Sequence, residues 1–333
     1  MTRWAQVETV GGPIEARSLG ATLMHEHVFI LDSEVNHNYP ERSWDGDRES
    51  RIADAAETLR GVAARGIDTI VDLTVLGLGR SIPNIQAVNA QVDLNIVVAT
   101  GIYTFKMLPQ FIYNRPVERA TDSGETRDVM VDLFVRDITE GIGDTGVKAA
   151  ILKCCTDQPG VTRSIDRVLR AIARAHRRTG VPISTHTNAL HQTGRDQQRV
   201  FAEEGVDLTR VVVGHSGDTT DLDYLRELMD CGSTIGMDRF GLYGPGFPSF
   251  DERVDTVARL CELGYADRMI LSHDTMCHTD SHPGMHAQNP DWVFHHLSDA
   301  VLPALRQRGV DEAQVDQMLV ANPRRIFEHQ GAY

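Results

Sequence analysis

The sequence predicts an α/β fold of the (β/α)₈ barrel class, and three observations lead to this prediction. Eight short apolar runs follow one another along the chain, helical patterns separate them, and side chains able to bind metals stand at the ends of five runs. A barrel of this class takes roughly 250 residues and grows by insertions in its loops. A chain of 333 residues therefore accommodates one TIM barrel with long loops at the C-terminal face, and we expect a single domain over residues 1–333.

The apolar runs are short and nearly continuous, which is typical of strands buried on both faces of a parallel sheet. The predicted strands are residues 20–23, 68–73, 95–100, 147–153, 181–186, 210–215, 233–238 and 268–274. Alternation of such strands with helices favours a parallel sheet closed into a barrel.

The segments between the runs carry apolar residues at three- and four-residue intervals, which predicts helices. The predicted helices are residues 51–65, 127–142, 162–179, 221–231 and 252–263. Residues 36–47 and 105–126 lack this pattern and carry aromatic side chains, so we expect mobile loops at the barrel mouth.

The first run leads into Met24-His25-Glu26-His27. Residues i and i+2 of a strand point to the same face, so His25 and His27 would aim both imidazoles at one point. Four further residues of the ligand type end later runs: Lys153, His186, His215 and Asp274. Catalytic groups of such barrels come from the C-terminal ends of the strands. The sequence therefore predicts an active site at this end of the barrel.

Four imidazoles and a carboxylate suit divalent zinc, cobalt, manganese or iron. Five protein ligands exceed the three that an open catalytic zinc takes, which favours two metal ions joined by a bridging group. A carboxylate usually bridges, but the fourth run ends in Lys153. Burial lowers the pKa of a lysine, and its neutral amine can take up carbon dioxide. We infer that carbamylated Lys153 is the bridge; the alternative is an ordinary ammonium paired with Asp274 or Asp157.

Seven motifs in this order extend over nearly the whole chain: Gly12-Pro13-Ile14, Thr22-Leu23-Met24-His25-Glu26-His27, Ile151-Leu152-Lys153-Cys154, Ile183-Ser184-Thr185-His186-Thr187, Val213-Gly214-His215-Ser216-Gly217-Asp218, Leu271-Ser272-His273-Asp274 and Asn322-Pro323-Arg324-Arg325-Ile326-Phe327. Together they resemble the phosphotriesterase family of the amidohydrolase superfamily, and within it the phosphotriesterase-like lactonases. The resemblance implies a buried α metal and a more exposed β metal, with a hydroxide between them. It assigns to the α metal His25, His27, Lys153 and Asp274, and to the β metal Lys153, His186 and His215.

Asp274, bound to the metal and the hydroxide, would accept the proton of the hydroxide. The resemblance gives roles to three further residues beside the metals. It makes Asp218 the residue that passes the proton outward; the alternative for Asp218 is to cap the N-terminus of a helix. Tyr103 matches the tyrosine that orients the lactone, and its alternative is an aromatic residue of the barrel mouth. Arg239 matches an arginine of the pocket wall, although Asp238 could equally pair with it in a structural salt bridge.

Two loops depart from the lactonase pattern. Residues 275–286 are polar and rich in histidine where lactonases carry an apolar channel, and residues 188–192 lack an expected histidine and arginine pair. His278, His282 and His286 would bind a third metal or, alternatively, belong to a solvated loop that responds to pH.

The predicted function is a binuclear-metal hydrolase that opens lactones, N-acyl-homoserine lactones in particular, as in quorum quenching. Organophosphate triester hydrolysis would be a side activity. The alternative is a dedicated phosphotriesterase (aryldialkylphosphatase) or another ester or lactone hydrolase of the family. Tyr103 favours the lactonase, whereas the polar loop at 275–286 favours the phosphotriesterase or another hydrolase of the family. A catalytically silent barrel that binds a ligand or a structural metal is a third hypothesis.

The composition limits the partners. A net charge of −14 argues against nucleic acid and anionic membranes. Five cysteines without paired spacing suggest reduced thiols and a cytoplasmic protein. The opening residues lack a signal-peptide core, and no run approaches the length of a membrane span. The family resemblance adds a homodimer.

Overall fold

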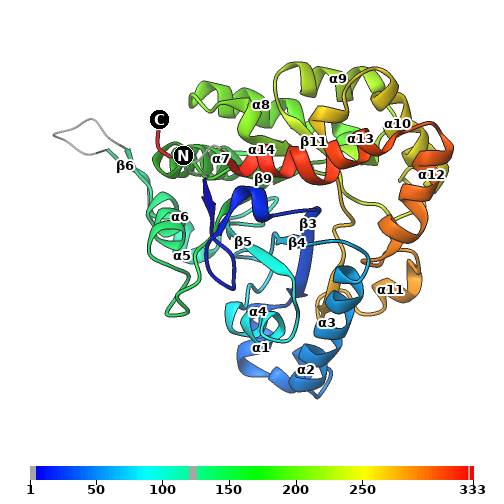
Figure 1. Ribbon diagram of the computed structural model, residues 1–333. Helices are drawn as coiled ribbons and strands as arrows, with labels where there is room; N and C mark the ends of the chain where they lie inside the picture. Colours follow the sequence, from blue (N-terminus) through cyan, green and yellow to red (C-terminus); the bar gives the residue numbers. More distant parts are fainter. Residues whose placement is uncertain (1–4, 120–125, 329–330) are drawn as a thin grey trace.

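The structure is a computed structural model that describes residues 5–119, 126–328 and 331–333. Its main feature is a nine-stranded sheet in the order β12-β11-β10-β9-β8-β5-β4-β3-β13, in which the paired strands run parallel. The helices surround this sheet (Figure 1). The strands are β3 (Thr22–Ile30), β4 (Thr69–Asp72), β5 (Asn95–Gly101), β8 (Ile151–Cys155), β9 (Ile183–His186), β10 (Val211–Val213), β11 (Thr234–Met237), β12 (Met269–Leu271) and β13 (Met276–Thr279). Each of the eight predicted strands is present.

The eighth strand of the barrel is divided into β12 and β13, and these two pieces pair with opposite neighbours. β12 pairs with β11 and β13 pairs with β3, so the two edges of the sheet are consecutive in the chain. Between them the amide of Asp274 donates to the carbonyl of His25 at 2.9 Å, and the amide of His27 donates to the carbonyl of Thr275 at 2.9 Å. The residues that interrupt the strand, 272–275, include Asp274.

The five predicted helices are present as α3 (Arg48–Ala63), α6 (Val129–Thr139), α7 (Arg163–Thr179), α9 (Leu222–Asp230) and α10 (Phe250–Glu262). Each begins after a side chain that accepts a backbone N–H of the first turn, as N-cap residues do. These N-caps are Asp47, Asp128, Thr162, Asp221 and Ser249.

Several helices were not predicted from the sequence pattern, and α8 (Thr193–Glu203) shows why. Its buried face is partly polar: Gln197 donates to Thr156 and to the carbonyl of His186, and Gln198 donates to Ser233. Such a face has no apolar periodicity to detect. The others are α1 (Ser33–Asn38), α2 (Pro40–Ser43), α4 (Ile82–Asn89), α5 (Gln110–Tyr113), α11 (Met285–Gln288), α12 (Leu302–Gln307), α13 (Glu312–Asp316) and α14 (Asn322–Glu328).

The two expected mouth loops thus contain regular structure. α1 and α2 occupy most of residues 36–47, and α5 and the antiparallel pair β6 (Glu118–Arg119) and β7 (Thr126–Arg127) occupy part of 105–126. Residues 120–125 lie outside the described residues. A second antiparallel pair, β1 (Gln6–Val7) and β2 (Ile14–Glu15), precedes the barrel.

The strands alternate between two apolar clusters. Leu152 belongs to the larger cluster between sheet and helices, whereas Ile151 belongs to a smaller one with Val71, Val97 and Val212. Because the strand period is two, Lys153 continues the row of Ile151 toward the C-terminal end. Among the described residues no helix is long and apolar enough to cross a bilayer.

Gly101 ends β5 where its neighbour β8 approaches most closely. Its φ is +139°, and a Cβ there would lie 1.9 Å from the carbonyl oxygen of Lys153. Gly244 has a matching φ of +142° but nothing within 4 Å of its Cβ position. Both alanine substitutions strain the backbone, and Gly101→Ala adds an overpacking penalty of about 1–3 kcal/mol. We expect urea unfolding to show this difference in free energy of unfolding; equal losses would contradict the close approach.

Candidate metal centre

The six predicted metal ligands meet at the C-terminal end of the barrel. They come from separate strands: His25 and His27 from β3, Lys153 from β8, His186 from β9, and His215 and Asp274 from the residues that follow β10 and β12. All six side chains are buried. The rings of His215 and His186 lie 4.5 Å apart, and those of His215 and His25 lie 4.7 Å apart.

Asp274 lies at the centre of this group. Its Oδ1 is 3.1 Å from Nε2 of His27 and 3.3 Å from Nε2 of His25, and its Oδ2 is 3.7 Å from Nε2 of His215. Arg239 Nε donates to Oδ2 at 2.8 Å. Burial alone would raise the pKa of Asp274, but the facing imidazoles of His25 and His215 and the guanidinium of Arg239 hold that pKa well below its usual range. The side chain is therefore a carboxylate.

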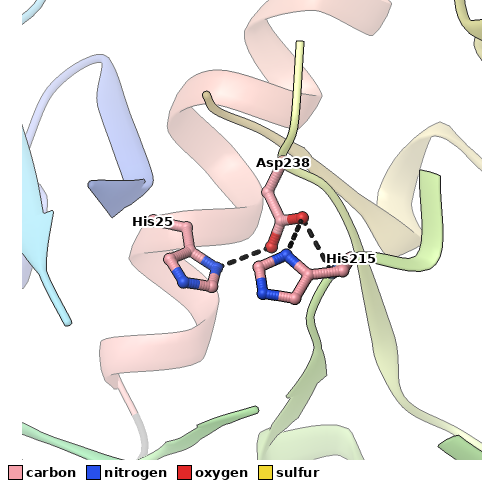
Figure 2. A group of neighbouring side chains, drawn as sticks. All are labelled: His25, His215 and Asp238. Atoms are coloured by element: carbon pink, nitrogen blue, oxygen red, sulfur yellow. Dashed lines mark hydrogen bonds and ion pairs between the residues drawn. The ribbon is translucent and has the colours of Figure 1, made fainter. Parts of the chain in front are cut away.

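Asp238 organises two of the histidines (Figure 2). Its Oδ2 lies 2.7 Å from Nδ1 of His25, and its Oδ1 lies 3.1 Å from Nδ1 of His215 and accepts the amide of His215 at 2.7 Å. A carboxylate at Nδ1 favours the tautomer with the proton there, which leaves the lone pair on Nε2. Both Nε2 atoms face Asp274. The alternative of a structural salt bridge between Asp238 and Arg239 is wrong for the described residues, because Arg239 pairs with Asp218 and Asp274 instead.

The other two histidines are also held by a neighbour. Nδ1 of His27 is 2.8 Å from the Thr74 hydroxyl, and Nε2 of His186 is 3.0 Å from Oδ2 of Asp157. Asn188 donates to the other oxygen of Asp157 at 2.8 Å. Burial lowers the pKa of His186 to about 4, so the ring is neutral near pH 7. A neutral imidazole is the form that binds metals.

Lys153 is fully buried, and its Nζ lies 2.8 Å from Nε2 of His25. Burial lowers the pKa of its ammonium, which favours the neutral amine. Within the described part of the chain, Asp274 pairs with the three histidines and Arg239, and Asp157 pairs with His186. Neither carboxylate forms the ion pair with Lys153 that the alternative required.

A row of largely buried charged side chains leads away from Asp274. Arg239 bonds to Asp274 and, through Nη1, to Asp218 Oδ2 at 2.9 Å; Arg253 Nη2 donates to Asp218 Oδ1 at 2.8 Å. Asp218 ends a short 3₁₀ turn, and the N-cap of α9 is Asp221. The capping alternative for Asp218 is therefore wrong. Asp218 reaches Asp274 only through the guanidinium of Arg239.

Two aromatic rings stand beside His186. The ring centroid of Tyr103 lies 5.7 Å from that of His186, nearly perpendicular to it, and the ring of Phe105 lies 5.0 Å away. Burial raises the pKa of the Tyr103 phenol, so it is protonated. Phe105 was not identified from the sequence, although it follows Tyr103 by two residues.

The three histidines of the final loop line one cavity, but among the described residues they form no cluster with metal-binding distances. His278 Nε2 contacts the carbonyl of Ser43 at 2.9 Å and its ring stacks on Trp44, whereas His286 lies against Trp292. Among the described residues, the groups that could hold a metal are His25 with His215 and Asp238, and His25 with His27 and Asp274. The third metal site suggested for residues 278–286 is therefore not formed.

Comparison with known proteins gives the family. The sequence profile of the phosphotriesterase family matches residues 5–327. The chain belongs to the phosphotriesterase family. It is 54% identical over 330 residues to the Phosphotriesterase homology protein of Mycobacterium tuberculosis, covering 98% of this chain and 99% of that one. It is 37% identical over 318 residues to the Aryldialkylphosphatase of Saccharolobus solfataricus, covering 94% and 96%.

A solved structure, that of the phosphotriesterase from Mycobacterium tuberculosis, superposes with a TM-score of 0.92 at 53% sequence identity, covering 98% of this chain and 100% of that chain. The barrel prediction is thus confirmed. As a phosphotriesterase-family protein, the chain is a metal-dependent hydrolase of small-molecule esters. The donors fit the binuclear metal chemistry of the family, because neutral imidazoles and an ionised carboxylate meet in a buried site.

Replacing Asp238 by Asn should weaken zinc binding by roughly 10- to 100-fold, because the amide cannot accept from both histidines at once. Chelator competition measures the zinc Kd. Asp137→Asn is the matched control, since that carboxylate also accepts two side chains, those of Arg80 and Thr100, away from the centre. An unchanged zinc Kd in Asp238→Asn would limit Asp238 to a structural role.

Proposed function

We propose that this phosphotriesterase-family hydrolase is a lactonase that opens lactones, N-acyl-homoserine lactones in particular, and hydrolyses organophosphate triesters as a side activity. The observation that carries the proposal is the protonated Tyr103 phenol beside His186. A phenol at this position can donate to an oxygen of a bound lactone and orient its ring. The second candidate is a phosphotriesterase, favoured by the similarity to the Aryldialkylphosphatase of Saccharolobus solfataricus.

The metal ligands are part of the proposal. His25, His27, carbamylated Lys153 and Asp274 hold one divalent ion, and the same carbamate with His186 and His215 holds the second. The ions are zinc, cobalt, manganese or iron, according to supply. A bound pair of such ions supplies hydroxide at neutral pH and a Lewis acid for the substrate's carbonyl or phosphoryl oxygen.

Asp274, Arg239 and Asp218 handle the proton released when water attacks. The carboxylate of Asp274 accepts it, with Oδ2 held by Arg239. Burial by itself would lower the pKa of Arg239, but the charges of Asp218 and Asp274 raise it, so the guanidinium keeps its proton. The proton therefore passes from Asp274 to Asp218 around Arg239, through solvent.

The proposal also includes a homodimer in the cytoplasm. Large apolar side chains after β5 are exposed, with Met107 at 77%, Tyr113 at 68% and Phe111 at 53% of their surface. Such side chains support an interface with a second copy. The five cysteines are unpaired, which suits a reducing compartment.

The substrate preference is tested by kcat/KM of metal-replete enzyme on an acyl-homoserine lactone, an aliphatic lactone and an aryl dialkyl phosphate triester. We expect a lactone preference of about 100-fold, equivalent to about 2.7 kcal/mol of differential transition-state binding. Tyr103→Phe removes a single hydroxyl and should lower kcat/KM for the lactones more than for the triester. A triester preference in the unaltered enzyme would instead support the phosphotriesterase.

Lys153→Ala tests the carbamate. The variant should retain at most one metal ion per chain and lose hydrolysis, because the bridging oxygens are gone. Elemental analysis counts the metal, and a carbamate signal in carbon-13 NMR after growth on labelled bicarbonate should disappear. Lys148→Ala, which removes a partly exposed ammonium 3.9 Å from Glu8, should change neither the metal content nor the carbamate signal. A Lys153→Ala protein that keeps two metal ions and full activity would contradict the carbamate assignment.

A further inference from the structure

We propose that Glu26, the residue between His25 and His27, is the positioning residue that holds Asp274 at the metal centre. The inference rests on the proposed role of Asp274 as a metal ligand. It adds a residue whose side chain does not enter the centre, because alternate residues of a strand point to opposite faces.

The backbone at Asp274 requires a support. Its φ is +56°, in the left-handed region that residues other than glycine rarely adopt. Among the described non-glycine residues, four have a positive φ, and two of these are the candidate ligands His215 and Asp274. Strained backbone at a functional site persists only when surrounding contacts hold it.

The Glu26 carboxylate supplies such contacts on both sides of Asp274. Its Oε1 accepts from the Ser272 hydroxyl at 2.9 Å, from the His273 amide at 2.9 Å and from His273 Nδ1 at 2.7 Å. Its Oε2 accepts from the Thr275 amide at 3.1 Å. Glu26 is fully buried, and the imidazole closest to its carboxylate is that of His273. One carboxylate thus fixes the residues before and after Asp274.

The proton on His273 is placed by a second contact. The amide of Leu297 donates to His273 Nε2 at 2.9 Å, so this nitrogen carries the lone pair and Nδ1–H donates to Glu26. The indole of Trp292 donates to the carbonyl of His273 at 2.6 Å. Residues 292–297 therefore brace the same turn from the outside of the barrel.

Ser272 links the turn to the other candidate ligands. Its hydroxyl accepts the amide of His25 at 3.0 Å while it donates to Glu26. The Asp274 amide in turn donates to the carbonyl of His25 at 2.9 Å. The carboxylate of Glu26 therefore sets the spacing between β3, which carries two histidines, and the turn that carries Asp274. A glutamine at this position has one acceptor oxygen, and its amide group would face a backbone N–H.

The test is Glu26→Gln, with zinc Kd by chelator competition, the visible spectrum of the cobalt-loaded protein, and kcat and KM on whichever substrate the enzyme prefers. We expect a zinc Kd weaker by roughly 10- to 100-fold and a changed cobalt spectrum. We also expect kcat to fall by about tenfold or more while KM stays within about threefold. Asp128→Asn is the control, because this buried carboxylate binds Arg167 and the Met130 amide and, among the described residues, contacts none of the candidate metal ligands.

The proposal is overturned if Glu26→Gln and Asp128→Asn have the same zinc Kd, cobalt spectrum and kcat. Glu26 would then be an ordinary buried carboxylate of the core. If Glu26→Gln does not fold, Ser272→Ala removes one donor only; it should shift zinc Kd in the same direction, and no shift would overturn the proposal. Asp274→Ala distinguishes failure of the ligand assignment of Asp274 from failure of the positioning role of Glu26. Unchanged zinc binding in that variant contradicts the ligand assignment itself, whereas lost binding with a normal Glu26→Gln protein contradicts only the positioning role.

Discussion

Asp238 receives hydrogen bonds from His25 and His215 and thereby joins the strand β11 to β3 and to the end of β10. A buried carboxylate is stable only where donors replace its water. Burial would raise the pKa of Asp238, but His215 and His25 hold that pKa well below its usual range. The same bonds turn both Nε2 atoms toward Asp274. The rest of the site depends on this contact, because it sets the tautomer and the direction of two rings.

The remaining charges of the barrel end follow from the same requirement. Arg239 lies between Asp274 and Asp218, and Arg253 bonds the far oxygen of Asp218, so each buried anion of this row has a cationic or N–H partner. Lys153 differs from these arginines: among the described residues it forms no ion pair with a carboxylate, and its hydrogen-bond contact is the imidazole of His25. A buried lysine without a carboxylate is poised to lose its proton. The arginines of the barrel end are thus paired with carboxylates and Lys153 is not, which distinguishes the centre from a set of structural salt bridges.

Aromatic and histidine side chains lie in the segments that follow β5 and β12. Tyr103 and Phe105 lie in the segment after β5, next to His186. Of the histidines of residues 278–286, His278 packs on Trp44 and Ser43 and His286 packs on Trp292, whereas His282 is exposed. Among the described residues, none of the three belongs to a group that could hold a metal.

The sequence by itself determined the eight strands, five of the helices and the convergence of six ligand-type residues, because strand periodicity and the parallel barrel place strand ends together. Only the tertiary structure decided the rest. Asp238 between two histidines, Glu26 beneath the Asp274 turn and the split eighth strand each depend on groups that are far apart in the chain. Helices such as α8 bury glutamines, so their pattern carries no apolar signal. Periodicity reports which face of an element is buried, but a hydrogen bond between distant side chains leaves no period in the sequence.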